Sequence, residues 1–468
     1  MSSYNEHKVS TPGDEKVSAD RGAGLRRRLS AGGVLVVGAT LAAGLTTPAG
    51  AAAPVAKVPS WPSVVSLMPQ FMQANATRST SELSARIDRK LTKRIKKAAL
   101  GSDVTMRVED LSSGKKLWAK KGNQAQVPAS TMKLATALAV LSVRKDSYTL
   151  KTTVRRAPGS RDITLIGGGD PLLSSGNLDE LAKSTAQAVR AQGLPEKKLR
   201  LNYDASLFSW ASLPSGWPSS YFSNYVARPS ALSRDRRKVG DPAKDAAVYF
   251  RDRLYVHGLK KGDLRGKVYQ NAPEAGASVV ASYDGHDVGD ALWRMLRYSD
   301  NSVAELMIRH VALARGEATT STGSANAVQA QLRLLDVPVK KSVFIDGSGL
   351  SRNNRLTAKT LTGILRASFS PQKTHLSSPY RNWSLPIAGQ SGTLSTRFKS
   401  SRTRCANGLV VAKTGTLTGV IALSGVAVGD DGRHRAFSVL VNNRPSGRSV
   451  TETRERVDQL ATTLTGCK

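Results

Sequence analysis

The sequence contains little of what metal centres are built from. It has 2 cysteines and 6 histidines among 468 residues, and neither Cys-x-x-Cys nor His-Glu-x-x-His occurs. Both patterns place side chains at the spacing that a metal ion requires. The histidines stand in no motif context, so we expect them to be structural or surface residues. A Gly-x-Ser-x-Gly segment is also missing, which disfavours a Ser-His-Asp hydrolase.

Acidic residues are scarce as well. The chain has 35 Asp and Glu against 69 Lys and Arg, which gives a formal net charge of +34. Such a surplus favours nucleic acid, an acidic membrane surface or an anionic polymer as partner. The basic residues are scattered, aromatic residues make up only 5% of the chain, and no nucleic-acid motif is present. We therefore expect affinity for anionic polymers or a membrane surface, and no nucleic-acid partner.

The N-terminal segment predicts export. Arg26–Arg28 is followed by an apolar stretch from Leu29 to Leu45 and by Ala51–Ala53, which offers an A-x-A cleavage site. The stretch is short for a membrane-spanning helix, although an uncleaved anchor remains the alternative. We expect a signal peptide at 1–53 and a linker at 54–80. The exported protein would be extracellular or associated with the wall or membrane.

The two cysteines are Cys405 and Cys467. Disulfides persist in oxidising compartments, so an exported chain could join this pair in a structural bridge. The alternative is two unpaired buried thiols.

Hydrophobic spacing predicts a mixed α/β (α+β) protein. Residues 81–100 predict an amphipathic helix with a basic outer face, and 104–119 predict a β-hairpin. Residues 149–281 change character, and we interpret them as an inserted domain or domains. The C-terminal part is predicted to contain two helices, three strands and a closing helix, at 287–297, 302–314, 408–413, 419–428, 434–441 and 451–463.

Ser130 and Lys133 form a Ser-x-x-Lys motif at the start of a predicted helix. Residues three apart share a helix face, which places the ammonium group beside the hydroxyl. A lysine in a partly desolvated pocket can take the serine proton and so activate a nucleophile. The alternative is an ordinary buried helix with a capping serine. The same spacing recurs at Ser112, Ser113, Ser142 and Ser370.

Two further motifs follow in the chain. Ser299-x-Asn301 stands at a break between two predicted helices, and Lys413-Thr414-Gly415 stands at the end of a predicted strand. A glycine there lets a ligand approach the backbone closely. A lysine beside it suits a carboxylate. Each motif is weak when taken alone.

The three motifs in this order resemble the signature of the penicillin-binding proteins and serine β-lactamases. Other segments resemble the low-molecular-mass class C penicillin-binding proteins, which are D-alanyl-D-alanine carboxypeptidases and endopeptidases. These segments are 168–171, 346–353, 385–389 and 392–394. The resemblance implies a penicillin-binding-protein/β-lactamase-like domain with an antiparallel sheet flanked by helices. Residues 81–148 and 282–468 would form this catalytic domain, and 149–281 would interrupt it.

The resemblance also implies roles for residues. Ser130 would attack the carbonyl between two terminal D-alanines and form an acyl-enzyme, with Lys133 as general base. Ser299 would relay a proton to the leaving amine, with Lys413 keeping Ser299 polar, and Asn301 would bind the substrate backbone.

The remaining roles concern binding. Lys413, Thr414 and Gly415 would hold the terminal carboxylate, and the backbone N–H groups of Ser130 and Thr416 would form the oxyanion hole. Arg352 could bind a side-chain carboxylate of the peptide, and the alternative is a structural loop arginine. No metal or organic cofactor is implied. Peptidoglycan stem peptides are the implied substrates, and β-lactam antibiotics are the implied inhibitors.

Two other functions are weighed against this one. A β-lactamase usually carries a glutamate that speeds water attack on the acyl-enzyme, and no Glu-x-x-x-Asn is placed for that after Ser130. A non-catalytic wall-binding protein would rely on its basic surface alone, and the intact motifs count against it.

Overall fold

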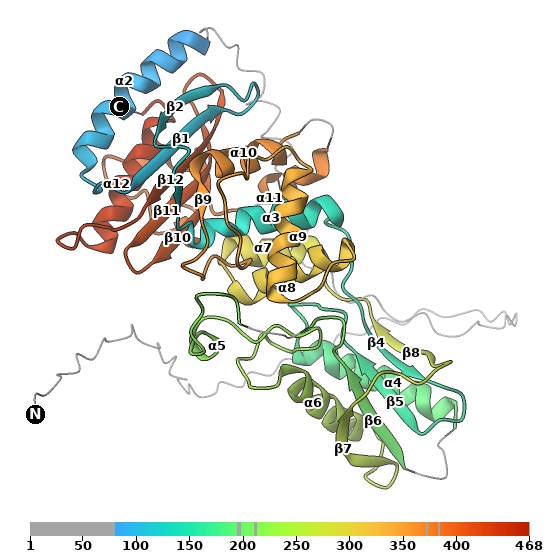
Figure 1. The fold of residues 1–468 in the computed structure, drawn as a ribbon. Coiled ribbons are helices and arrows are strands. Elements are labelled where there is room, and N and C mark those ends of the chain that lie inside the picture. The colour runs from blue at the N-terminus through green and yellow to red at the C-terminus, as the bar shows by residue number, and fades with distance from the viewer. Residues whose placement is uncertain (1–79, 194–197, 210–212, 371–372, 382–383, 468) are drawn as a thin grey trace, which may run out of the picture. The chain divides into compact units, whose positions relative to one another are not determined.

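The computed structural model describes residues 80–193, 198–209, 213–370, 373–381 and 384–467 (Figure 1). The predicted signal peptide at 1–53 and all but the last residue of the predicted linker lie outside these ranges. The described residues all belong to one compact unit. Within them, no helix is both long enough and apolar enough to cross a bilayer.

The first sheet joins the two ends of the described chain. It has five antiparallel strands in the order β10-β11-β12-β1-β2. Pairing of β12 with β1 places the C-terminal strands beside the N-terminal hairpin. The strands are β1 (Val104–Asp110), β2 (Lys116–Lys120), β10 (Val410–Leu417), β11 (Val420–Val428) and β12 (His434–Val441).

Helices cover both faces of this sheet, which explains why β11 is buried along almost its whole length. On one face lie α2 (Thr80–Ala98) and α12 (Val450–Thr463), which share an apolar core with β1 and β12. The opposite face packs against a second core built from helices of the central part of the chain. These are α3 (Lys133–Val143), α7 (Val288–Arg297), α8 (Asn301–Ala314), α9 (Ser321–Arg333) and α10 (Ala358–Ser368).

A second five-stranded sheet lies within the predicted insertion. Its order is β7-β6-β5-β4-β8, with β5, β6 and β7 parallel and β4 antiparallel to both of its neighbours. Helices α4 (Ser175–Ala191) and α6 (Pro242–Val256) share its apolar core. The strands are β4 (Thr152–Arg156), β5 (Asp162–Ile166), β6 (Leu199–Asp204), β7 (Leu264–Gln270) and β8 (Ser278–Tyr283). β8 therefore runs past residue 281, where we placed the end of the insertion.

The shorter elements lie in connecting segments. They are β3 (Ala125–Gln126), which pairs with β9 (Leu356–Thr357), and the single-turn helices α5 (Tyr221–Asn224) and α11 (Ser378–Arg381).

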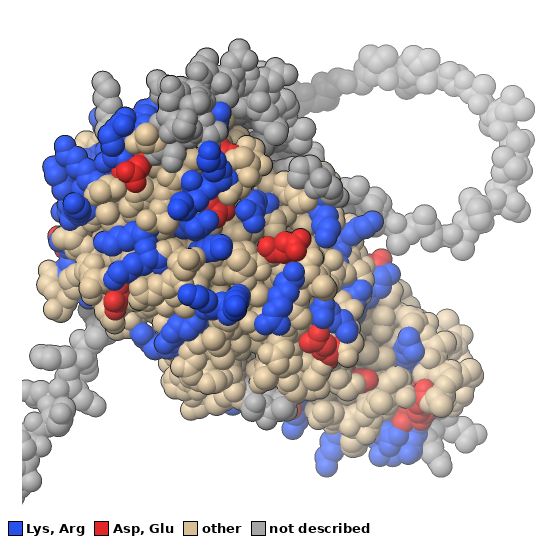
Figure 2. All heavy atoms as spheres, turned by 45° about the horizontal axis from the view of Figure 1, so that its top comes forward, with Lys and Arg blue, Asp and Glu red and all other residues tan. Residues whose placement is uncertain are grey.

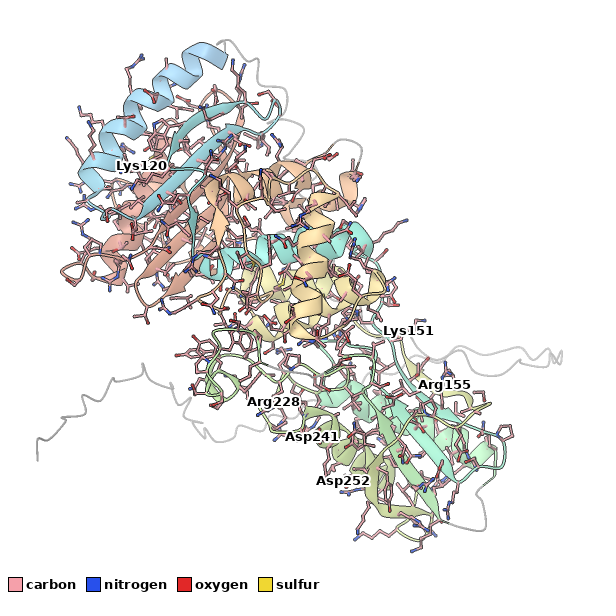
Figure 3. All side chains as sticks on the ribbon, viewed as in Figure 1. Lys120, Lys151, Arg155, Arg228, Asp241 and Asp252 are labelled. Atoms are coloured by element: carbon pink, nitrogen blue, oxygen red, sulfur yellow. A yellow bond between two sulfur atoms is a disulfide. The ribbon has the colours of Figure 1, made fainter. Side chains whose placement is uncertain are left out.

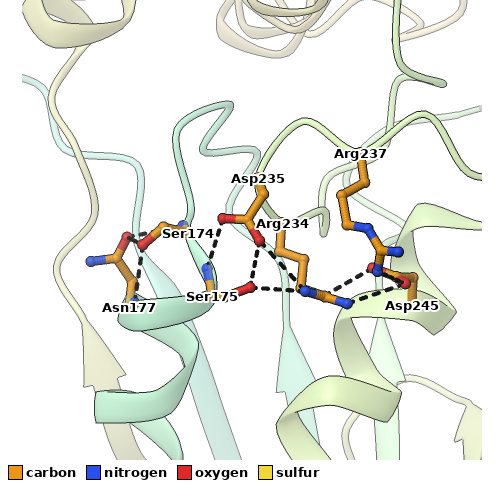
Figure 4. A network of polar contacts seen from close by, with 7 residues as sticks. All are labelled: Ser174, Ser175, Asn177, Arg234, Asp235, Arg237 and Asp245. Atoms are coloured by element: carbon orange, nitrogen blue, oxygen red, sulfur yellow. Dashed lines mark hydrogen bonds and ion pairs between the residues drawn. The ribbon is translucent and has the colours of Figure 1, made fainter. Parts of the chain in front are cut away.

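Polar contacts tie the start of α4 to α6 (Figure 4). Asp235 accepts a hydrogen bond from the Ser175 backbone N–H at 3.0 Å, and Arg234 donates to the Ser175 hydroxyl at 2.8 Å. Arg234 also donates to Asp245, in the first turn of α6, at 3.3 Å. These contacts hold the segment that leads into α6 against the start of α4.

The entry and exit of the insertion lie side by side at a tight joint. Thr149 forms a β-bridge with Asp287. A Cβ atom on Gly168 would lie 1.7 Å from the Lys151 carbonyl oxygen, so only glycine fits there. Asp170 closes the joint by accepting hydrogen bonds from the backbone N–H of His286 at 3.1 Å and from its ring at 2.9 Å.

The structure joins Cys405 and Cys467 in a disulfide across a sequence separation of 62 residues. Cys405 lies in a short 3₁₀ turn before β10, and Cys467 follows α12. The bond therefore fastens the last helix to the segment that leads into the edge strand of the first sheet.

We expect reduction of this disulfide to lower the free energy of unfolding by about 2–4 kcal/mol, because the bond restricts a long loop in the unfolded chain. Urea unfolding with and without a reductant measures the effect, and a Cys405→Ser/Cys467→Ser variant serves as control. An unchanged unfolding midpoint in both comparisons would contradict a stabilising role.

Candidate active site

Ser130 lies in a 3₁₀ turn, whereas we predicted that it begins an α-helix. Residues Ala129–Met132 form this turn, η2, and α3 begins only at Lys133. No side chain caps this described turn, so Ser130 is not an ordinary helix cap. Ala129 is fully buried with a left-handed φ of 46°. That conformation costs an L-residue on the order of 1–3 kcal/mol. The turn leaves the Ser130 hydroxyl available to Lys133.

The Lys133 side chain is fully buried and its ammonium group has three hydrogen-bond acceptors. Nζ lies 3.1 Å from Ser130 Oγ, 2.8 Å from Asn301 Oδ1 and 2.7 Å from the Ser348 carbonyl oxygen. The structure thus brings the Ser-x-x-Lys and Ser-x-Asn motifs together around one amine, although they are far apart in the sequence.

Burial sets the protonation behaviour of Lys133. Desolvation of the ammonium form lowers its pKa to about 8. The negative charges of Asp346, Glu305 and Asp300 oppose this shift. With this pKa about one tenth of the amine is neutral at pH 7 and about half at pH 8, and a neutral amine at hydrogen-bond distance can accept the Ser130 proton.

The loop between α7 and α8 carries Ser299 in a left-handed conformation, with φ of 61°. Asp300 caps α8 by accepting from the Ser302 backbone N–H at 3.0 Å. Asn301 begins α8, and its Nδ2 donates to the Tyr225 carbonyl oxygen at 3.0 Å. Asn301 thereby links Lys133 to the backbone of the insertion. Among the contacts between described residues, Ser299 has no hydrogen bond to Lys413, which is the partner that the resemblance implied.

The Lys413–Gly415 motif lies in the middle of β10, and the prediction that it ends a strand is wrong. Pairing with β11 continues to Leu417, because the β-ladder overrides the low strand propensity of glycine. A Cβ atom on Gly415 would lie 2.9 Å from the Pro128 carbonyl oxygen and 3.1 Å from the Ala129 Cβ. The β10 backbone therefore lies directly against the residues that lead into Ser130.

Lys413 is also fully buried. Desolvation and the positive charge of Lys133 hold its pKa well below the ordinary value. Its Nζ donates to the Thr414 carbonyl oxygen at 3.1 Å. The two lysines therefore influence each other, and an anion between them would favour their charged forms.

The predicted binding residues have different surroundings. The Thr414 hydroxyl lies 2.8 Å from the Thr393 hydroxyl, so the 392–394 segment contacts β10. Thr416 Oγ1 accepts a hydrogen bond from Arg454 at 3.1 Å. Arg352 is exposed and donates to the Thr418 carbonyl oxygen at 2.6 Å, which places it beside the β10–β11 turn.

The sequence did not identify Trp217 and Tyr225 as site residues. Trp217 Nε1 donates to Asp346 Oδ2 at 2.7 Å, and its ring packs with Phe222 and Leu350. Asp346 in turn accepts from the Gly349 backbone N–H at 2.7 Å, so it also shapes its own loop. The aromatic residues were visible in the sequence, but nothing there connected the insertion to Ser130.

The described residues contain no group of three or more His, Cys, Asp or Glu side chains arranged to hold a metal ion. What they do contain is a serine hydroxyl, a buried amine that can lose its proton, and a second buried lysine. This set suits nucleophilic acyl transfer to the serine.

The sequence matches the family described as D-Ala-D-Ala carboxypeptidase 3 (S13) over residues 87–237 and 232–464. The chain belongs to this family. A relative, the carboxypeptidase DacB of Mycolicibacterium smegmatis, is 31% identical over 386 residues, which cover 78% of this chain and 80% of that protein. The D-alanyl-D-alanine carboxypeptidase of an Actinomadura species is 29% identical over 487 residues, with coverage of 85% and 87%.

The fold of this S13 chain is also that of a solved structure. Penicillin binding protein 4 from Haemophilus influenzae aligns with a TM-score of 0.66 at 22% identity, covering 80% of this chain and 98% of that chain. The predicted α+β fold and the low-molecular-mass class C family are confirmed. So is the predicted enzyme class, a serine-type D-Ala-D-Ala carboxypeptidase.

We expect Gly415→Ala to slow the release of D-alanine from a peptide ending in D-Ala-D-Ala by about 10- to 100-fold. The added methyl group would meet the Pro128 carbonyl oxygen at 2.9 Å, so β10 and the Ser130 turn must move apart. Gly447→Ala is the matched control, because a Cβ atom there meets no atom within 4 Å. Equal rates in the two variants would show that this close approach does not position the site.

Proposed function

We propose that this chain is exported and removes the terminal D-alanine from peptidoglycan stem peptides through an acyl-enzyme on Ser130. The observation that carries the proposal is the fully buried Lys133 amine at 3.1 Å from the Ser130 hydroxyl, with a pKa of about 8. The same site is proposed to cut the cross-links between stem peptides.

The reaction begins when neutral Lys133 takes the Ser130 proton and Oγ attacks the carbonyl carbon of the penultimate D-alanine. Backbone N–H groups of Ser130 and Thr416 stabilise the oxyanion that forms. Ser299 passes a proton to the amine of the terminal D-alanine as the peptide bond breaks, and protonated Lys133 returns a proton to Ser299 and becomes neutral again. Water then attacks the ester on Ser130, Lys133 accepts a proton from that water and gives it to Ser130 Oγ as the ester bond breaks, and the shortened peptide leaves.

The other residues hold the substrate. The charged form of Lys413, with Thr414 and the close-lying backbone at Gly415, binds the terminal carboxylate. Asn301 binds the peptide backbone with its amide. Arg352 binds a carboxylate on the side chain of the stem peptide, since its guanidinium group is exposed beside the β10–β11 turn.

β-Lactams are proposed to acylate Ser130 in the same way and to leave slowly. Export is supported by the Cys405–Cys467 disulfide, because such bonds persist outside the reducing cytosol.

We expect mass spectrometry to find one penicillin adduct per wild-type chain, on the tryptic peptide that contains Ser130. Ser130→Ala should show no adduct and no release of D-alanine, since no other group replaces the nucleophile. Ser142→Ala is a suitable control, because Ser142 has the same Ser-x-x-Lys spacing and lies at the far end of α3. An adduct on Ser130→Ala, or peptidase activity without Ser130, would refute the mechanism. A function that survives in Ser130→Ala would favour the non-catalytic wall-binding alternative.

We also propose that the basic outer face of α2 binds an anionic wall polymer. Arg89, Lys93, Lys96 and Lys97 line a groove of about 490 Å³ with Asp88 as its acidic residue. Within the described part of the chain these four cations form no hydrogen bond or ion pair. Lys and Arg side chains are spread over the face of the molecule drawn in Figure 2, with few Asp and Glu among them, and Lys120 lies on β2, the strand that packs against α2 (Figure 3).

A polymer suits this face better than a lipid bilayer does. Among the α2 side chains that the structure describes, the large apolar ones, Ile87, Leu91 and Ile95, are buried in the core and cannot insert into lipid. Like charges one turn apart destabilise a helix by about 0.2–0.5 kcal/mol per pair, and a bound chain of anionic groups would relieve that repulsion.

We expect Arg89→Glu/Lys93→Glu/Lys97→Glu to lose at least about tenfold in affinity for immobilised polyphosphate at low salt, where surface charges are least screened. D-Alanine release from a soluble peptide should not change. A variant with glutamate at Lys183, Lys340 and Lys341 carries the same change in net charge elsewhere and should still bind. Equal losses in both variants would mean that only net charge matters. Binding of wild-type protein to vesicles containing phosphatidylglycerol, without binding to polyphosphate, would overturn the choice of a polymer.

A further inference from the structure

Glu305 is a fully buried carboxylate for which the proposed reaction has no role. It lies on α8, one turn after Asn301. Its Oε1 accepts hydrogen bonds from the backbone N–H groups of Gly347 at 3.0 Å and Ser348 at 2.9 Å. The other oxygen, Oε2, lies 3.8 Å from Arg309 Nη1 and accepts no hydrogen bond from the described residues.

The two N–H groups belong to the loop segment whose carbonyl faces Lys133. Ser348 donates its N–H to Glu305 and accepts a hydrogen bond from Lys133 Nζ on its carbonyl oxygen at 2.7 Å. The Thr136 hydroxyl holds the neighbouring Gly347 carbonyl at 2.8 Å. A short chain of contacts therefore leads from Glu305 through one residue to the amine beside Ser130.

We propose that Glu305 is a positioning residue for Lys133. It fixes the Ser348 carbonyl that orients the amine, and its negative charge sets the pH at which that amine becomes neutral and can take the Ser130 proton. The inference rests on the proposed role of Lys133 as general base.

The charged groups around Lys133 and Glu305 determine whether the loss of Glu305 raises or lowers the pKa of Lys133. Lys133 faces the anionic Asp346, Glu305 and Asp300, which raise its pKa, and Lys413 is the positive neighbour. Burial and then the charge of Asp346 raise the pKa of Glu305 itself to about 7, while Arg309 and the Ser348 hydrogen bonds lower it, so the carboxylate is mostly charged at the pH where Lys133 titrates. Removing the Glu305 charge withdraws one of the three anions that favour protonated Lys133, so Lys133 would lose its proton at a lower pH.

The test is the pH dependence of the rate at which penicillin acylates Ser130. In wild-type protein the rate should rise with pH as Lys133 becomes neutral, with a midpoint near its pKa of about 8. Glu305→Gln keeps a hydrogen-bond acceptor but loses the charge. We expect its rising limb to move to lower pH by at least about half a unit.

Glu305→Asp distinguishes the effect of the carboxylate charge from the effect of its hydrogen bonds to the loop backbone. The shorter side chain keeps the charge but moves away from the two N–H groups, so we expect acylation at the optimum pH to fall about tenfold or more without a shift to lower pH. Glu109→Gln is the control for a lost buried carboxylate, since Glu109 is 3% exposed on β1 and pairs with Arg107. It should destabilise the fold without moving the profile.

A Glu305→Gln profile that coincides with that of the wild type would overturn the inference. If Glu305→Gln does not fold, a Glu305→Asp rate equal to the wild-type rate would do the same. Failure of the proposed function looks different, because wild-type protein would then form no penicillin adduct on Ser130 at any pH.

Discussion

The ammonium group of Lys133 is removed from water completely, and the remainder of the site is organised around that fact. Burying a charge costs on the order of several kcal/mol unless hydrogen bonds and opposite charges compensate it. Ser130, Asn301 and the Ser348 carbonyl provide the hydrogen bonds. The pKa of Lys133 nevertheless falls to about 8, which shows that these hydrogen bonds and the nearby negative charges do not fully offset the cost of burial. An amine stabilised only in part is what a general base near neutral pH requires.

Each contact of Lys133 comes from a different part of the fold. Ser130 stands in the turn before α3, Asn301 begins α8, and Ser348 lies in the loop before β9. The first sheet makes the arrangement possible, since the pairing of β12 with β1 brings the C-terminal strands to the N-terminal hairpin. Gly415 then allows β10 to approach the Ser130 turn without a side chain between them. The insertion contributes as well, because the Tyr225 carbonyl holds Asn301.

Much of this could be predicted from residue patterns. The spacing of apolar residues and the positions of turn residues predicted α2, the first hairpin and the three C-terminal strands. In each of these elements the apolar residues repeat at the interval that places them on one buried face. The motif residues Ser130, Lys133 and Asn301 were predicted because three motifs that are weak alone occur together in an order that resembles a known signature. The strand limits of β10 were missed, since pairing with β11 decides them and a single-sequence pattern does not show that pairing. The 3₁₀ turn at Ser130 was missed because the segment is helical by composition, and its contacts with β10 join distant parts of the sequence.

The residues that support the site from behind its reacting groups could not be recognised in the sequence. Glu305 resembles any glutamate on a helix, and only the structure shows that it is buried and bonded to the Gly347 and Ser348 backbone. Trp217 belongs to a loop rich in proline, serine and glycine, and its contact with Asp346 crosses 129 sequence positions. Propensity and periodicity describe local structure, so they carry no information on such distant contacts.

The measurement that tests this account most directly is the titration of the Lys133 amine itself. Nuclear magnetic resonance of protein labelled at the lysine Cε and Nζ atoms follows each amine as pH changes, and a Lys133→Met variant identifies the signal. The account predicts a midpoint of about 8, displaced from the ordinary value of 10.5. A Lys133 signal that titrates at the ordinary value would show that the amine stays charged at neutral pH, and would contradict its role as the base that activates Ser130.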